Sequence, residues 1–269
     1  MKHEPVPARE VTRRDLLIGA GKCAFGAAAV TALASVVPGL VSKAHALGGT
    51  TEKWPWPYQK LDPATTAEIA YKEWYRVFCG AAVISAVFGQ LREKVGEPYR
   101  SFPIDAFIFL EGGVSGWGTV CGANAGANIV TNLIVGPRIS GTDNGMLMGS
   151  ELMQWYTTTA LPAYVPKEPK IKAVIPATVS NSPLCHLSVG KWMKAANKAF
   201  ASDERRDRCA RLTADVTAQL VTHLNEWKDG TYKTKGVSPA AKYGIPTQYN
   251  CTECHGSKVP SPPQAAKKT

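Results

Sequence analysis

Gly118-Thr-Val-Cys121-Gly122-Ala-Asn-Ala-Gly126 is the stretch that decides how this chain folds. It lies within an apolar segment, residues 116–135, that is rich in glycine and alanine and is predicted to be helical. Gly118, Gly122 and Gly126 recur every four residues, so they would line one face of this helix. A face of small residues allows a neighbouring backbone or a bulky cofactor to approach closely. We therefore expect this helix to pack at short distance against another part of the molecule.

Hydrophobic periodicity predicts helices on both sides of this stretch. Residues 203–227 give the clearest one, with Asp203-Glu204 at its start and a stop at Asp229-Gly230. The other predicted helices are residues 64–95, which end at Gly96-Glu-Pro98, residues 144–160 and residues 185–200. Residues 162–183 contain five prolines and are expected to form a crossover loop with a β-like run, Ile171-Lys-Ala-Val-Ile175.

Cys251-Thr-Glu-Cys254-His255, near the C-terminus, is the attachment signature of haem c. Cys251 and Cys254 would each form a thioether with a haem vinyl group, and His255 would be the proximal iron ligand. The alternative is a surface disulfide or half of a zinc site beside an incidental histidine. Zinc would need two more ligands nearby, and the fourteen residues after His255 contain no cysteine, histidine or acid.

The N-terminus has the pattern of a twin-arginine export signal. Val11-Thr12-Arg13-Arg14-Asp15-Leu16-Leu17 precedes a weakly apolar stretch to Leu40, and Ala44-His45-Ala46 resembles a cleavage site. An uncleaved membrane anchor is the alternative, and it would bring membrane contact. Haem c is attached outside the cytoplasmic membrane, so the two motifs agree on a periplasmic protein. The twin-arginine route exports folded proteins, which suggests a second cofactor inserted before export.

These features predict a mainly α protein, a helical bundle followed by an irregular haem-binding segment. The predicted organisation is a signal peptide (1–46), an extended Pro- and Trp-rich segment (47–63), a helical domain (64–230) and a C-terminal haem c segment (231–269).

The chain is basic, with a formal net charge of +10. Removing residues 1–46, which hold six Lys or Arg and three Asp or Glu, would leave +7. A basic surface near a redox centre can steer an acidic redox partner, although it can equally be a solvated face without one. We find no nucleic-acid motif, and an export signal argues against nucleic acid. Much of the excess lies around the haem motif, in Lys228, Lys233, Lys235, Lys242, Lys258, Lys267 and Lys268.

Four more cysteines fall one in each of four predicted helices or helix ends: Cys79, Cys121, Cys185 and Cys209. In an exported protein they would usually form two disulfides, and inert buried thiols are a further possibility. Their apolar helical surroundings also suit a site in which each helix presents one thiolate inward to an iron–sulfur cluster. Their spacing leaves these alternatives open.

The order of these cysteines, with Cys121-Gly-Ala-Asn-Ala-Gly126 at the centre, resembles the C-GCAxxG-C-C family. Together with the twin-arginine signal and the terminal haem motif, it is similar to the split-Soret cytochromes c of that family. The resemblance implies an α-helical homodimer, bis-histidine haem iron, and an iron–sulfur cluster, [2Fe–2S] or [4Fe–4S], on the four cysteines. Those cytochromes carry two haems per chain, whereas this sequence has a single Cys-x-x-Cys-His, so haems could stack only across a dimer.

Only His186 and His223 remain as histidine candidates for the distal position, once the signal peptide and His255 are set aside. His186 adjoins Cys185 and is favoured, because haem and cluster would then be close neighbours. His223 follows Cys209 by fourteen residues, about 21 Å along a helix. Each can also be an ordinary surface histidine. Methionine is another possible ligand type, and the chain offers Met146, Met148, Met153 and Met193.

No hydrolase, phosphate-binding or metalloprotease motif accompanies these residues. Iron with two histidine ligands has no open position for a substrate, so the sequence favours an electron carrier over an enzyme. A haem enzyme with an open iron site that reduces a small oxidant is the alternative. A third reading is a structural or assembly protein whose four cysteines form disulfides.

Overall fold

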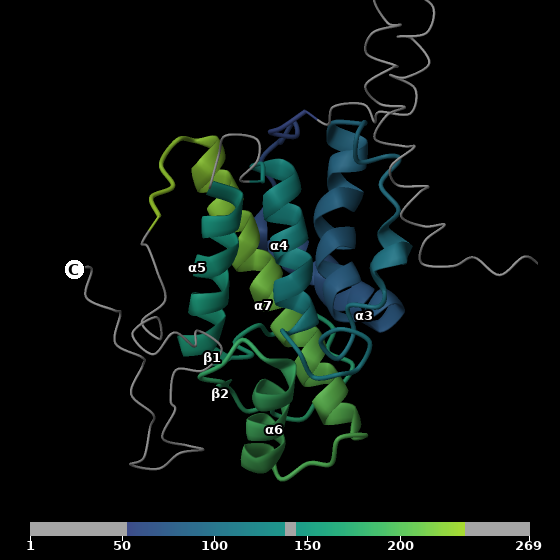
Figure 1. Cartoon of the computed structure of the whole chain (residues 1–269). Coiled ribbons are helices and arrows are strands. Elements are labelled where there is room, and N and C mark those ends of the chain that lie inside the picture. Colours follow the sequence, from purple (N-terminus) through teal and green to yellow (C-terminus); the bar gives the residue numbers. More distant parts are fainter. Residues whose placement is uncertain (1–52, 138–143, 235–269) are drawn as a thin grey trace, which may run out of the picture. The chain divides into compact units, whose positions relative to one another are not determined.

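The computed structural model describes residues 53–137 and 144–234, and within these ranges the protein is mainly helical, as predicted (Figure 1). Long helices stand side by side, and a smaller helix lies with a short antiparallel strand pair at one end. The elements in chain order are α3 (Pro63–Lys94), the 3-10 helix η1 (Ile104–Phe107), α4 (Gly122–Ile134), α5 (Asn144–Thr158), β1 (Ala160–Leu161), β2 (Thr178–Val179), α6 (Cys185–Ala196) and α7 (Asp203–Lys228).

The two longest helices, α3 and α7, form the centre of the core. The Asp62 side chain caps α3 by accepting the Thr65 N–H at 2.7 Å, and Ser202 caps α7. Within the described ranges only α3 has the length and hydropathy of a membrane span. However, 67% of its most apolar window is buried, as in the core helix of a folded domain.

α4 crosses α3 at very short distance through glycines, as the sequence predicted. A Cβ built on Gly126 would lie 2.4 Å from the carbonyl oxygen of Gly80, and one on Gly122 would lie 2.0 Å from that of Leu110. The expectation for Gly118 was wrong, because α4 begins only at Gly122. Gly118 lies in the preceding loop with φ +71°, a conformation that favours glycine, and a Cβ there would lie 2.9 Å from the Cβ of His186.

The connection between α5 and α6 differs from the expectation in one detail. Ile171–Ile175 forms no strand, and Val174 in its middle is 92% exposed. The antiparallel pair is instead made by β1 and β2, with Ala160 opposite Val179 and Leu161 opposite Thr178. Among residues 53–137 and 144–234 no partner strand runs beside this stretch, so its strand propensity is not used.

The described part of the extended segment, from residue 53, packs on the helices. Trp56 lies edge-on to Tyr99 at 5.4 Å between ring centroids, and the Tyr58 hydroxyl donates to the Asn225 side chain at 2.8 Å. The predicted signal peptide and the haem segment from residue 235 onward, with Cys251, Cys254 and His255, lie outside the described residues.

Candidate functional site: a cavity bordered by four cysteines

Cys79 follows a break inside α3. Phe78 has φ 60° and ψ −166°, so the helix is interrupted immediately before the cysteine. A non-glycine residue in such a conformation costs on the order of 1–3 kcal/mol, and this strain must be balanced by its surroundings. The Gly80 N–H donates to the Leu110 carbonyl at 3.1 Å, and the Trp74 indole N–H donates to the Cys79 sulfur at 3.3 Å. The break therefore fixes the direction of the Cys79 side chain.

Cys121 and Cys185 are brought together by two chain segments that run antiparallel. The Cys121 N–H donates to the Pro183 carbonyl at 2.8 Å, and the Cys185 N–H donates to the Thr119 carbonyl at 2.7 Å. Cys121 precedes the first residue of α4, and Cys185 is the first residue of α6. Two thiols at helix N-termini lie where the helix dipole favours negative charge.

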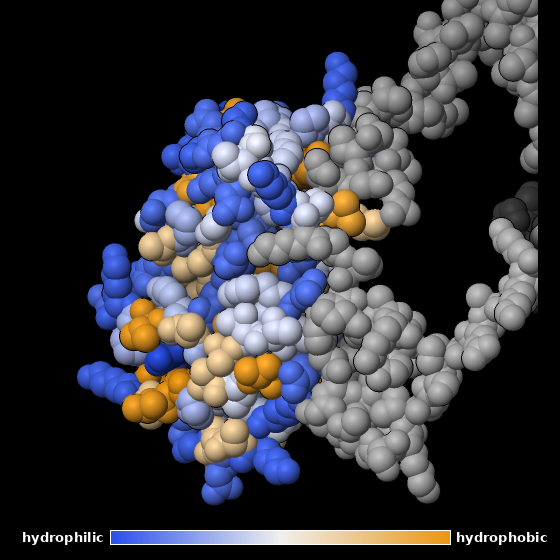
Figure 2. Space-filling view, turned by 90° about the vertical axis from the view of Figure 1, so that its left-hand side faces the viewer, coloured by the Kyte–Doolittle hydropathy of each residue, from blue (hydrophilic) through white to orange (hydrophobic). Residues whose placement is uncertain are grey.

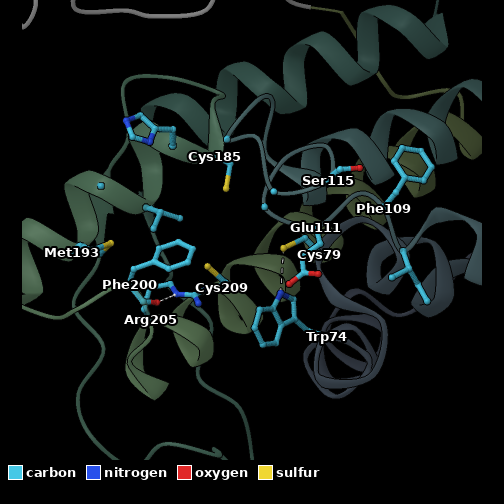
Figure 3. A pocket seen from close by; sticks show the side chains of 17 residues that line it. Trp74, Cys79, Phe109, Glu111, Ser115, Cys185, Met193, Phe200, Arg205 and Cys209 are labelled. Carbon is cyan, nitrogen blue, oxygen red and sulfur yellow. Dashed lines mark hydrogen bonds between the residues drawn. The ribbon is translucent and has the colours of Figure 1, made fainter.

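Cys209 completes the group from the second turn of α7. Together with Cys79, Cys185 and His186 it lines a cavity of about 810 Å³. Figure 3 shows the sulfur atoms of Cys79, Cys185 and Cys209 facing the same space from different elements. Cys121 lies close enough for its charge to raise the pKa of Cys79, although burial is the larger cause. The structure thus brings all four predicted cysteines together.

All four cysteines are free thiols, so the structure does not contain the disulfides of the alternative reading. Burial raises the pKa of Cys79, Cys121 and Cys185. Burial therefore favours the neutral thiol form, and thiolates at these positions would need a cationic partner. Within residues 53–137 and 144–234, no three Cys, His, Asp or Glu side chains approach closely enough to hold a single metal ion.

A buried arginine adjoins the cavity, and sequence reasoning did not single it out as a site residue. Arg208 is only 2% exposed. Its guanidinium donates to the Ser188 hydroxyl at 2.7 Å and lies 3.9 Å from the Cys209 sulfur. Trp74 is a second residue that was missed. Arg208 could have been noticed in the sequence, because it is a charged residue within the buried stripe of α7. The contact of Trp74 with Cys79 could not, because it depends on the break in α3.

The mouth of the cavity is apolar. Ile108, Phe109 and Phe200 line it and remain 37%, 47% and 63% exposed. The neighbouring loop carries Trp117, which is 84% exposed. Figure 2 shows that the visible face is mostly hydrophilic with separate apolar patches. Large exposed side chains around a cavity are typical of a binding surface.

The two candidate distal histidines have different surroundings. His186 is exposed at the cavity, and its backbone N–H donates to the Gly118 carbonyl at 3.1 Å. His223 lies on α7 away from the lining residues, with its Nε2 2.9 Å from the Gln219 side chain. Among the methionines, Met193 lines the cavity and Met148 is fully buried.

Fold and site define a helical domain with four neighbouring thiols, three of which line one cavity, and comparison with known proteins identifies its class. Residues 78–223 match the family model described as "Putative redox-active protein (C_GCAxxG_C_C)", and the chain belongs to this family. It is 34% identical over 256 residues to the split-Soret cytochrome c of Desulfovibrio desulfuricans, covering 92% of this chain and 88% of the relative. The resemblance stated from the sequence is thereby confirmed.

A solved structure of the split-Soret cytochrome c from Desulfovibrio desulfuricans ATCC 27774, described for a novel iron centre, has the same fold. It aligns with a TM-score of 0.64 and 32% identity, over 77% of this chain and 86% of that chain. The family and these two matches support a redox role as an electron carrier.

Proposed function

We propose that this protein is an exported c-type cytochrome that carries electrons through one covalent haem and one iron–sulfur cluster. The observation that carries the proposal is the meeting of four free cysteines from four separate segments, three of which line one cavity, beside a buried arginine. The relatives support it, because one of them is a cytochrome described for a novel iron centre.

The residues fit an iron–sulfur cluster better than a single metal ion. No three ligand side chains of the described ranges converge on one point, and about 810 Å³ leaves room for several bridged atoms. Cluster binding would release the thiol protons and replace them with iron, which removes the cost of buried thiolates. Four cysteines fit either [2Fe–2S] or [4Fe–4S]. Cys79, Cys121, Cys185 and Cys209 are the proposed ligands.

Haem c would be attached to Cys251 and Cys254, with His255 as proximal ligand. We favour His186 as the distal ligand, with His223 as the alternative. His186 is exposed at the cavity and follows a proposed cluster ligand directly, so this choice would place haem and cluster within a short electron-transfer distance. The histidine could come from the same chain or from the second chain of a homodimer.

The remaining parts of the proposal follow from the sequence. The twin-arginine pattern supports a periplasmic location, and this export route would allow the cluster to be inserted before export. The basic charge of the mature chain suits an acidic redox partner.

Metal analysis of protein purified without air tests the proposal directly. We expect one haem per chain, with further iron and acid-labile sulfide in equal amounts. Four titratable thiols per chain without sulfide would refute the cluster. Carbon monoxide separates carrier from enzyme, because bis-histidine iron should not bind it readily. Rapid binding to the reduced protein would favour the enzyme alternative, a haem with an open iron position.

A further inference from the structure

Arg208 has an unusual position for a charged side chain. It is 2% exposed and lies on α7 directly before Cys209. Removing a charge from water costs several kcal/mol, and proteins normally offset this with an opposite charge and hydrogen bonds. The partner that balances Arg208 should therefore be visible in its surroundings.

The surroundings contain hydrogen-bond acceptors but no salt bridge. The Nη2 group donates to the Ser188 hydroxyl at 2.7 Å and faces the Ser188 carbonyl at 3.4 Å. The Nη1 group points to the Cys209 sulfur at 3.9 Å, and Nε has no partner. No carboxylate of residues 53–137 or 144–234 forms an ion pair with this guanidinium.

A second buried arginine on the same helix shows the usual solution. Arg211 is paired with Asp207, with 2.6 Å between Nε and the carboxylate oxygen. Arg208 and Arg211 are neighbours on the surface of α7, but their guanidinium groups have different partners, and that of Arg211 also donates to the Ile171 carbonyl at 2.8 Å. The fold thus provides an acid for Arg211, whereas Arg208 has a hydroxyl, a carbonyl and a sulfur as partners.

We infer that Arg208 is the fixed countercharge of the metal centre and raises its reduction potential. This rests on the proposed function. A cluster with four thiolates carries a net charge of about −2 when oxidised and about −3 after accepting one electron, for both [2Fe–2S] and [4Fe–4S]. A buried cation that keeps its charge stabilises the more negative state more strongly. The inference therefore does not depend on the cluster type.

Trp74 acts in the same direction with a neutral donor. Its indole N–H lies 3.3 Å from the Cys79 sulfur, and Figure 3 marks this hydrogen bond with a dashed line. Hydrogen bonds to ligand sulfurs are among the features that set cluster potentials. We expect its effect to be smaller, because it adds no net charge.

The test is a redox titration of the full-length holoprotein, with dithionite as the electron donor and the cluster followed by electron paramagnetic resonance. Arg208→Gln should lower the ratio of reduced to oxidised cluster at least tenfold at the wild-type midpoint, about 59 mV for one electron. Arg208→Lys, which keeps the charge, should shift it less. Trp74→Phe, which keeps the ring and loses the donor, should shift it in the same direction.

Arg211→Gln is the matched control, since it removes a buried arginine of the same helix whose guanidinium is bonded to Asp207 and the Ile171 carbonyl and not to a cysteine sulfur. It should lower the unfolding midpoint and leave the cluster potential unchanged. An unchanged potential in Arg208→Gln would overturn the inference, as would an equal shift in Arg211→Gln. If Arg208→Gln holds no cluster, Arg208→Lys decides the question because it keeps the charge: an Arg208→Lys protein that also holds no cluster, or whose reduced-to-oxidised ratio falls tenfold or more, would overturn the inference. Absence of acid-labile sulfide from the wild-type protein would instead refute the proposed function.

Discussion

Replacing Gly126 by alanine should test how closely the glycine contact between α3 and α4 is adjusted. The added Cβ would lie 2.4 Å from the carbonyl oxygen of Gly80 and 2.8 Å from its Cα. Both atoms belong to the backbone, so no side-chain rotation can relieve the overlap. The two helices would have to separate by about 1 Å to restore ordinary contact distances.

The expected magnitude follows from two opposing effects. Overpacking of this kind costs about 1–3 kcal/mol, whereas alanine is about 1 kcal/mol better than glycine inside a helix. The net loss in the free energy of unfolding is roughly 0–2 kcal/mol, and because the overlap is with backbone atoms we expect Gly126→Ala to fall in the upper half of this range. Gly89, within α3, is the matched control because nothing lies within 4 Å of the position that a Cβ would take there. Gly89→Ala should raise the free energy by roughly 0.5–1 kcal/mol.

The assay is equilibrium urea unfolding of the two variants and the wild type, followed by helical circular dichroism and accompanied by iron analysis. Gly80 directly follows Cys79, so the separation in Gly126→Ala should also reduce cluster iron, whereas Gly89→Ala should not. The reasoning would be refuted if both alanines changed stability in the same direction, or if Gly126→Ala kept wild-type stability and iron.

Three further predictions concern individual side chains. Burial raises the pKa of Asp215 from 3.8 to about 7, so the folded state holds the proton more tightly and stability falls as pH rises from about 4 through 7. The loss in the free energy of unfolding over this pH range is at most roughly 4 kcal/mol, and Asp215→Asn should remove this pH dependence. An equal change in melting temperature between pH 5 and pH 8 in the wild type and in Asp215→Asn would contradict this. Cys209→Ala should lose cluster iron and sulfide but keep the covalent haem, and an unchanged sulfide content would argue against its role as a ligand. His186→Ala should change the low-spin haem spectrum while His223→Ala leaves it intact, and the reverse result would transfer the distal role to His223.

The helices were predictable because their periodic apolar positions are the ones that the core uses. α7 runs from Asp203 to Lys228, close to the predicted 203–227, with the expected acidic start. The predictions that were wrong concern contacts between segments distant in the sequence. Ile171–Ile175 has strand-forming residues, but within the described residues no neighbouring strand provides hydrogen bonds, so it stays irregular. The break at Phe78 was not predictable either, since the surrounding sequence continues a helical pattern without Gly or Pro before it.

The candidate site likewise has a part that the sequence predicts and a part that it does not. The order of the four cysteines along the chain was sufficient to group them, because each falls at a predicted helix or helix end. Their partners were not accessible in the same way. Trp74 reaches the sulfur of Cys79 only because α3 is broken between them, and the long side chain of Arg208 on α7 reaches Ser188 on α6, twenty residues earlier in the chain. Such contacts arise from the packing of segments that are distant in sequence.

Three departures from ordinary folding preferences meet at this cavity. Phe78 adopts a backbone conformation that suits glycine, and Gly80 and Gly126 bring two backbones closer than side chains permit. Arg208 is buried without an ion pair to any carboxylate in the described part of the chain. Each departure alone costs stability, and local conflicts of this kind concentrate at functional sites. Phe78 and the glycines determine where Cys79 lies, whereas Arg208 determines which charge the cavity accepts. Different residues thus set the position of the cysteines and the charge of the cavity. A variant at Gly126 should therefore reduce the amount of bound cluster, whereas a variant at Arg208 should change the reduction potential of the cluster that is bound.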